Sequence, residues 1–270
     1  MQQTSDFINE CAELSSLLDS LQAQDWERKT QFEQWTINNI LTHLHFWNLQ
    51  VDLSLTDPEQ FIDKMQNEVL PSIMSRGFRT TEDEQISERG TDLLAAWQDT
   101  YRAMQARWLT LDPKQRVKWA GPEMSVRSAM TARQMETWAH AQAIYDVLGL
   151  ERDSHDRIAN VVVMGVNTFA WSFKTHQRAV PSTRPRLKLT LPSGKLLTFE
   201  QQTDQAGLIE GDAVEFAQVV TQTRNIADTQ LHVSGDIATQ WMAIAQCFAG
   251  GAVTPPAPRT RYRMTTTRHD

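Results

Sequence analysis

The sequence has few of the features that mark secreted or membrane proteins. Only two of its 270 residues are cysteine, Cys11 and Cys247, so no disulfide framework is expected. The first ten residues lack a basic start followed by an apolar run, so no signal peptide is predicted. The apolar run at residues 161–171 is too short to cross a bilayer. We therefore expect a cytoplasmic protein with no membrane partner.

Positive charge is also scarce. The chain has 26 Lys and Arg against 33 Asp and Glu, which gives a formal net charge of -7. Its longest basic cluster, at residues 259–263, is short. Binding to a phosphate backbone requires clustered Lys and Arg side chains, so no nucleic-acid partner is expected.

Bulky apolar side chains, by contrast, are plentiful, and in the first part of the chain they recur at helical spacing. Nine Trp and ten Met can fill a core or line an apolar pocket. Thr36 is a suitable N-cap, and Gly149 follows the last apolar residue of a long periodic segment. A polar stretch at residues 75–87 reads as a loop. The pattern predicts a helical bundle over residues 1–180, with helices at 6–23, 36–55, 88–109, 125–148 and 156–176.

The pattern changes after residue 180. Apolar and polar residues alternate at 186–191 and 196–202 on either side of a Pro-Ser-Gly-Lys turn, which predicts a β-hairpin. A helix at 211–224, a short strand at 231–233 and a helix at 237–248 follow. We expect an α+β protein with a small α/β domain at residues 181–252 and an extended tail at 253–270.

Glu136 and His140 form the most informative local pattern. Residues four apart on a helix share one face, with Cβ atoms about 5–6 Å apart, so both side chains can point at one ion. A Glu and a His four apart on a helix also occur often by chance. The alternative interpretation is that the two side chains only contact each other and bind no metal. The rest of this face favours the close approach of another helix, because it carries small residues: Ala129, Ala132 and Ala143.

A third ligand is available on the predicted helix at 36–55. His43 shares a core-facing stripe with Trp47, and a buried histidine needs a polar partner. His45 lies about 200° further round the helix, so both histidines cannot face the same ion. Periodicity alone does not choose between them. Two histidines and one carboxylate leave open positions on zinc, iron(II) or nickel, which is typical of a reactive metal site.

Three segments resemble a known family. Residues 35–44, WTINNILTHL, resemble the W-[ST]-V-x-D-x-[LV]-x-H-[LI] segment of the DinB-like superfamily, and above all of its mycothiol-dependent maleylpyruvate isomerase branch. Residues 119–125, WAGPEMS, and 135–140, METWAH, resemble segments of one group in that branch. The resemblance implies a DinB-like four-helix bundle that binds one divalent metal, expected to be zinc, through His43, Glu136 and His140. It thereby prefers His43 over His45.

The resemblance extends into the second part of the chain. Residues 210–213, EGDA, and 233–236, VSGD, are similar to the α/β domain that follows the bundle in this branch, which is akin to sterol-carrier-protein domains. The chain departs from the family pattern beside the metal motif, where Asn39 stands for the usual Asp, and Ala141 and Ala143 for the usual Gly and Asp. These departures leave the ligands intact, but they mean that the substrate cannot be carried over from the family.

The implied activity is a thiol-dependent isomerisation or transfer on a small unsaturated acid, with a low-molecular-weight thiol as co-reactant. Arg224 falls where the family relative carries a functional arginine and is our candidate for a catalytic cation; the alternative is a surface arginine at a helix C-terminus. The candidate substrate-binding residues are Arg133, Ser125 and Trp47. Each also has a purely structural explanation: an ion pair for Arg133, the N-cap of a helix for Ser125 and core packing for Trp47. Two alternatives remain: a metal-dependent hydrolase, and a non-catalytic module that binds a small molecule or a metal.

Overall fold

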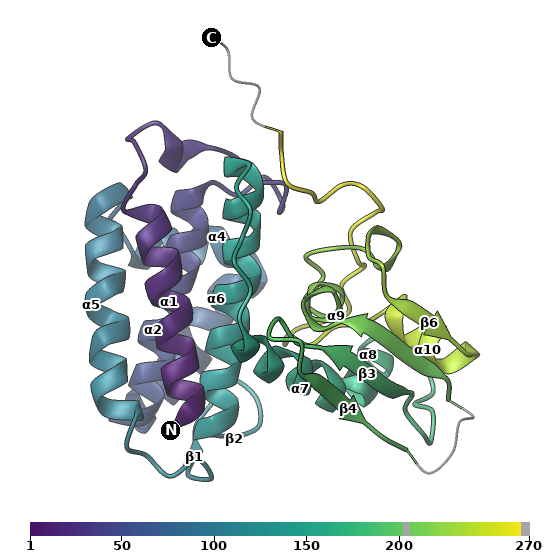
Figure 1. Cartoon of the computed structure of the whole chain (residues 1–270). Helices are drawn as coiled ribbons and strands as arrows, with labels where there is room; N and C mark the ends of the chain where they lie inside the picture. The colour runs from purple at the N-terminus through teal and green to yellow at the C-terminus, as the bar shows by residue number, and fades with distance from the viewer. Residues whose placement is uncertain (202–205, 266–270) are drawn as a thin grey trace. The chain divides into compact units, whose positions relative to one another are not determined.

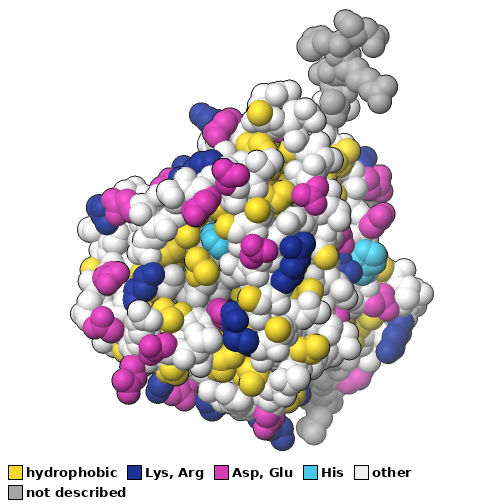
Figure 2. Space-filling model, turned by 90° about the vertical axis from the view of Figure 1, so that its left-hand side faces the viewer, with side chains coloured by type: hydrophobic (Ala, Val, Ile, Leu, Met, Phe, Trp, Pro, Cys, Tyr) yellow, Lys and Arg dark blue, Asp and Glu magenta, His cyan; other side chains and the backbone are white. Residues whose placement is uncertain are grey.

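The computed structural model describes residues 1–201 and 206–265 and combines helices with a small sheet, as the α+β prediction requires (Figure 1). Its contacts divide the chain into two compact units, Met1–Ile144 and Tyr145–Asp270. Among the described helices, none is long and apolar enough to cross a membrane. On the face shown in Figure 2, acidic and basic side chains are intermixed.

The first unit is built on long helices that lie side by side (Figure 1). They are α1 (Gln2–Leu18), α2 (Ile37–Thr56), α5 (Gly90–Trp108) and α6 (Val126–Leu148), of which the residues from Tyr145 on belong to the second unit. The apolar stripes predicted from the sequence face inward, and each fully buried large side chain contributes about 1.5–3 kcal/mol to folding. This core includes the fully buried side chains of Phe7, Leu14, Ile40, Trp97 and Trp108.

The start of α2 confirms the predicted N-cap. The Thr36 hydroxyl accepts a hydrogen bond from the Asn39 backbone N–H, and Asn39 Oδ1 accepts one from the Thr36 backbone N–H. This reciprocal capping box satisfies two donors that helix formation leaves free. It also gives Asn39, which replaces the usual Asp, a structural role one turn before His43.

The stretch predicted as a loop at residues 75–87 is mostly helical, so that prediction was wrong. After α3 (Pro58–Lys64), a π-helical turn η2 (Met65–Val69) leads into α4 (Leu70–Gln85). Gly77, with φ 85° and ψ 167°, breaks α4 in the middle. The helical part of this stretch escaped prediction because Phe78 is the one large apolar residue at positions 75–85; Thr81 and Glu82 are the buried residues of α4. A short hairpin of β1 (Arg116–Val117) and β2 (Met124–Ser125) then precedes α6.

The second unit contains a four-stranded mixed sheet in the order β4-β3-β5-β6. Strands β3 (Arg186–Thr190) and β4 (Leu196–Phe199) form the predicted antiparallel hairpin. Strand β5 (Leu208–Asp212) pairs in parallel with β3 and was not predicted, because its Glu-Gly-Asp end reads as a turn. Strand β6 (His232–Ser234) pairs with β5. Position 202, the end of the predicted second strand, lies outside the described residues.

The helices of the second unit differ in length from the predictions. The segment predicted as one helix at 156–176 forms α7 (Ala159–Asn167) and α8 (Phe169–Thr175), which pack against α9 (Ala213–Val220) and α10 (Asp236–Met242). We placed the domain boundary at residue 180, whereas the compact units divide before Tyr145, because α7 and α8 pack with the C-terminal helices. The last five residues of the predicted tail lie outside the described residues.

Candidate metal centre

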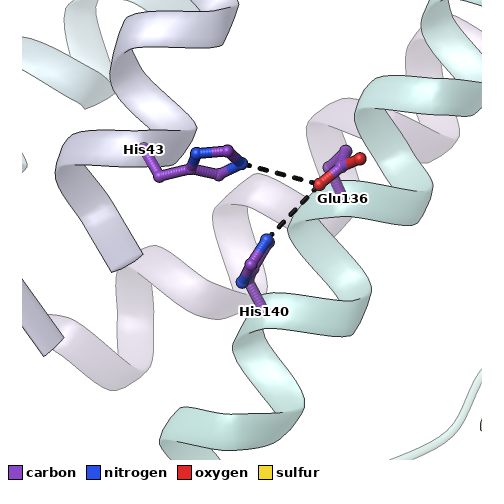
Figure 3. Close-up of side chains that lie close together, drawn as sticks. All are labelled: His43, Glu136 and His140. Atoms are coloured by element: carbon purple, nitrogen blue, oxygen red, sulfur yellow. Dashed lines mark ion pairs between the residues drawn. The ribbon is translucent and has the colours of Figure 1, made fainter. Parts of the chain in front are cut away.

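Three ligand atoms from two helices of the first unit converge on one point. His43 on α2 and Glu136 and His140 on α6 have ligand atoms within 4.8 Å of one another. The His43 Nε2 and Glu136 Oε2 atoms are 3.7 Å apart, and His140 Nε2 lies 3.4 Å from the same carboxylate oxygen (Figure 3). Two ligands of a tetrahedral zinc, each bonded at about 2.0–2.2 Å, lie roughly 3.4 Å apart, so these separations suit one divalent ion.

Arg133 fixes the two ligand-bearing helices to each other. Its Nε donates to Asn48 Oδ1 at 2.8 Å, and its Nη2 donates to the Leu44 backbone carbonyl at 3.2 Å. Leu44 follows His43 on α2, and Arg133 lies one turn before Glu136 on α6. The side chain is buried, at 3% exposure. Arg133 therefore sets the separation between the ligands, which is the structural reading of this residue.

Glu82 lies beside His43, a contact that was not predicted from the sequence. His43 Nδ1 lies 2.7 Å from Glu82 Oε1, and the Trp47 indole N–H donates to the same oxygen at 2.9 Å. A carboxylate only accepts, so Nδ1 carries the proton and Nε2 faces Glu136. Carboxylates of this kind orient histidines that bind metals and raise their basicity. Glu82 is 1% exposed. Its burial could not be predicted, because it lies in a polar stretch with no recognisable helix cap.

The pKa values of the three ligands reflect this arrangement. Burial lowers the pKa of His43, but the carboxylates of Glu82 and Glu136 outweigh burial and raise it to about 9. Burial alone raises the pKa of Glu136, yet hydrogen bonds with His140 and His43 bring it well below its ordinary value. Burial lowers the pKa of His140 below its ordinary value. The hydrogen bond with Glu136 opposes this change, and the charge on His43 lowers the pKa further. The metal-free centre thus holds an ionised carboxylate beside one protonated histidine.

Aromatic rings surround the two histidines. The Trp35 ring is stacked on His140, with centroids 5.9 Å apart and planes at 6°, and it meets His43 edge-on at 5.4 Å. Trp47 and Phe78 lie 6.3 and 6.4 Å from the His43 ring. Rings packed this closely hold both imidazoles in place.

The other candidate residues have different surroundings. His45 is buried, burial lowers its pKa, and it takes no part in the cluster of three ligands. Trp47 contacts both His43 and Glu82, so the structure brings it to the centre. Ser125 accepts a hydrogen bond from the Ser128 backbone N–H at 3.1 Å, which is the N-capping geometry.

Arg224 belongs to the second unit, where an ion pair holds its guanidinium. Its Nη1 and Nη2 atoms each donate to one Asp146 carboxylate oxygen at 2.7 Å, and Nη1 also donates to the Thr223 carbonyl. The two side chains are 13% and 4% exposed. Arg224 would have to break this bidentate ion pair with Asp146 in order to bind another anion.

The donor set of the centre fits a divalent transition metal. Two imidazole nitrogens and one carboxylate oxygen suit zinc, iron(II) or nickel, and three protein ligands leave coordination positions open. The oriented His43 ring meets a further requirement of such sites, because its Nδ1 is already occupied by Glu82 and Nε2 is the atom that faces the cluster.

Comparison with known proteins agrees with the resemblance of the motifs. The model of the mycothiol maleylpyruvate isomerase N-terminal domain matches residues 7–145, a segment that contains His43, Glu136 and His140. Two uncharacterized proteins of Mycobacterium tuberculosis, from strains CDC 1551 / Oshkosh and ATCC 25618 / H37Rv, are each 31% identical over 249 residues. The match covers 91% of this chain and 94% of each relative.

Solved structures show the same fold. The crystal structure of the mycothiol-dependent maleylpyruvate isomerase superposes with a TM-score of 0.53 at 12% identity. A mutant of that enzyme superposes with the same TM-score at 13% identity. Each match covers 81% of this chain and 87% of the solved one. By its domain match and its full-length relatives, the chain belongs to the family of the mycothiol maleylpyruvate isomerase N-terminal domain.

Proposed function

We propose that this protein binds one divalent metal ion, zinc in the simplest case, through His43, Glu136 and His140. We further propose that it is a thiol-dependent isomerase or transferase of a small unsaturated acid. The observation that carries the proposal is the convergence of three ligand atoms from two helices. The buried Glu82 supports it, because this carboxylate orients the His43 ring with Nε2 toward the other ligands.

A divalent metal bound here would favour the thiolate form of a coordinating thiol, and the thiolate is the nucleophilic form. The residues of the chain supply the remaining requirements. Glu82 keeps the His43 ring oriented, and Arg133 keeps α2 and α6 at the required separation. Trp35, Trp47 and Phe78 limit the access of water, which strengthens electrostatic interactions inside the site.

The proposed reaction follows the chemistry of the relative. A thiol adds to a cis double bond, rotation about the resulting single bond follows, and the thiol then leaves, so no net oxidation or reduction is required. The solved relative is named as mycothiol-dependent, and mycothiol is therefore the first thiol to test. The substrate class that we propose is a small acid with a cis double bond.

The finer predictions from the family stay part of this proposal. The first unit is proposed to be a DinB-like four-helix bundle, and the second to be related to sterol-carrier-protein domains; the helix order and the mixed sheet support these assignments. Trp47 and Ser125 are proposed to border the substrate. Arg133 and Arg224 are the weaker candidates for contact with substrate, since both guanidinium groups are held by other residues.

Metal content tests the first half of the proposal. Elemental mass spectrometry of the purified, zinc-reconstituted protein is expected to find about one equivalent. His43→Ala, Glu136→Ala and His140→Ala should each lose most of it, because two ligands bind far more weakly than three. His45→Ala is the matched control, a buried histidine on the same helix, and should keep the metal. Full occupancy in the ligand variants would refute the site.

Turnover tests the second half. The zinc-loaded protein should isomerise a cis-unsaturated acid such as maleylpyruvate only when a thiol is present, and Glu136→Ala should abolish this turnover. Cleavage of esters or amides without a thiol would instead indicate a hydrolase. Tight ligand binding with no turnover under either condition would indicate a binding module.

A further inference from the structure

Arg79 lies beside the proposed metal centre. It follows Gly77 and Phe78 in the second half of α4. The guanidinium carbon lies over the Trp35 ring, 5.6 Å from its centroid. Trp35 in turn contacts both histidine ligands. A single aromatic ring therefore separates this positive charge from the two imidazoles.

The guanidinium of Arg79 has few hydrogen-bond acceptors around it. Its Nε is buried and has no hydrogen-bond partner in the part of the chain that the structure describes. Its nearest acidic neighbour is Asp83, at 3.8 Å, which is beyond hydrogen-bond distance. Asp83 is itself engaged by Arg89 at 2.7 Å. A buried guanidinium nitrogen without an acceptor is costly unless a ligand or water satisfies it.

Arg79 differs in this respect from the arginines predicted from the sequence. Arg133 donates to Asn48 and to a backbone carbonyl, and Arg224 donates to both oxygens of Asp146. The side chain of Arg79 is 40% exposed, so an incoming anion can reach it. The neighbouring Phe78 is 47% exposed and packs against His43 and Trp47, so an apolar ring borders the approach.

We propose that Arg79 binds a carboxylate group of the substrate at the edge of the metal centre, with the Trp35 ring beneath its guanidinium. This inference rests on the proposed function and names the residue that would select an acid as substrate. A guanidinium pairs with a carboxylate through two parallel hydrogen bonds, which fixes orientation as well as charge. The Phe78 ring then borders the unsaturated part of the same molecule.

Binding of maleate to the zinc-loaded full-length protein tests the proposal by calorimetry. Maleate is a small cis-unsaturated dicarboxylate and therefore a minimal probe of the site. Arg79→Gln should weaken maleate binding about ten- to hundredfold, the effect expected from loss of a charged hydrogen-bonding partner. Arg79→Lys should restore it only in part, because an ammonium lacks the planar fork. Arg76→Gln is the control: this arginine lies on the same helix, but its partners are Glu84 and Ser72.

The outcomes separate the two proposals. Equal maleate affinity in wild type and Arg79→Gln would overturn the role of Arg79 and leave the metal site intact. A wild-type protein that holds zinc but does not bind maleate would overturn both the proposed substrate class and the role of Arg79. Zinc content is measured in each sample, and loss of zinc from Arg79→Gln would instead assign Arg79 a structural role and overturn the inference.

Discussion

His43 has a carboxylate beside each of its ring nitrogens, and the two contacts differ in kind. On the Nδ1 side, Glu82 is 2.7 Å away and almost fully buried. On the Nε2 side, Glu136 is 3.7 Å away, and its side chain is 26% exposed. The short buried contact holds the ring. The longer and more open one leaves room for an ion between the ligands, because a metal separates its ligands to about this distance.

Replacement of Glu82 by glutamine should therefore weaken metal binding without removing a ligand. The amide keeps the size of the side chain but loses the charge that orients His43 and raises its basicity, and such changes cost about ten- to a hundredfold in metal affinity. Chelator competition measures the zinc affinity. Glu84→Gln, an exposed change on the same helix, should leave it unaltered. An unchanged affinity in Glu82→Gln would show that Glu82 does not support the ligand.

Zinc uptake should release about one proton near pH 7, because the metal-free His43 is protonated there and must lose its Nε2 proton to bind. Its pKa is raised to about 9, so the proton competes with the metal throughout the neutral range. Glu136 is already ionised and His140 is neutral, because their pKa values are lowered. Affinity should then rise about tenfold per pH unit between pH 7 and 8. Calorimetry in buffers of different ionisation enthalpy counts the protons; a count near zero would contradict this protonation state.

At the scale of elements, α4 supplies three residues near the candidate ligands, in addition to Trp35 from the segment before α2. Phe78, Arg79 and Glu82 all follow the break at Gly77. The π-helical turn η2 and this break together interrupt the regular helix that would otherwise run on from α3. The position of the second half of α4 therefore depends on the conformation of one residue.

Gly77→Ala should accordingly disturb the metal centre from a distance. The backbone angles of Gly77, φ 85° and ψ 167°, belong to a region that only glycine adopts easily. An added Cβ meets no atom within 4 Å, so the cost of about 1–3 kcal/mol comes from backbone strain and not from a clash. We expect lower stability in urea unfolding together with weaker zinc binding. Gly121→Ala, which also meets no atom and has no positive φ, is the control and should change neither. Wild-type zinc affinity in Gly77→Ala would refute the dependence on this break.

At the scale of the whole molecule, each compact unit has its own buried charged group. The first unit holds the cluster of His43, Glu136 and His140 with Glu82. The second unit holds the ion pair between Asp146 and Arg224, in which a carboxylate at 4% exposure accepts two hydrogen bonds. A buried charge that loses its partner is strongly destabilising, so the second pair is expected to matter for folding.

Arg224→Ala should destabilise the second unit by about 3 kcal/mol or more, because it leaves the Asp146 carboxylate buried without its guanidinium. Urea unfolding measures the change. Arg263→Ala removes an exposed pair with Glu151 and should have little effect. Unchanged stability in Arg224→Ala, with loss of turnover in the zinc-loaded protein, would instead support the catalytic role predicted from the family.

The sequence by itself determined the local features of this protein. Glu136 and His140 share a helical face because their spacing matches the period of the helix, and Thr36 caps α2 through a residue three positions away. The hairpin of β3 and β4 follows from alternation around a turn. The three motifs also identified the family, and through it His43. These features depend on interactions between near neighbours in the chain.

Only the tertiary structure decided which distant residues meet. Periodicity left His43 and His45 equally placed, and the contacts between α2 and α6 place His43 beside Glu136. Glu82 lies 39 positions from His43 in a stretch without an apolar stripe, and its burial depends on that contact and on Trp47. The uncommitted Arg79 and the parallel strand β5 were likewise invisible in the sequence. The physical reason is common to all of them: a helical or strand period reports the neighbours of a residue along the chain, whereas burial and pairing depend on segments that only folding brings together.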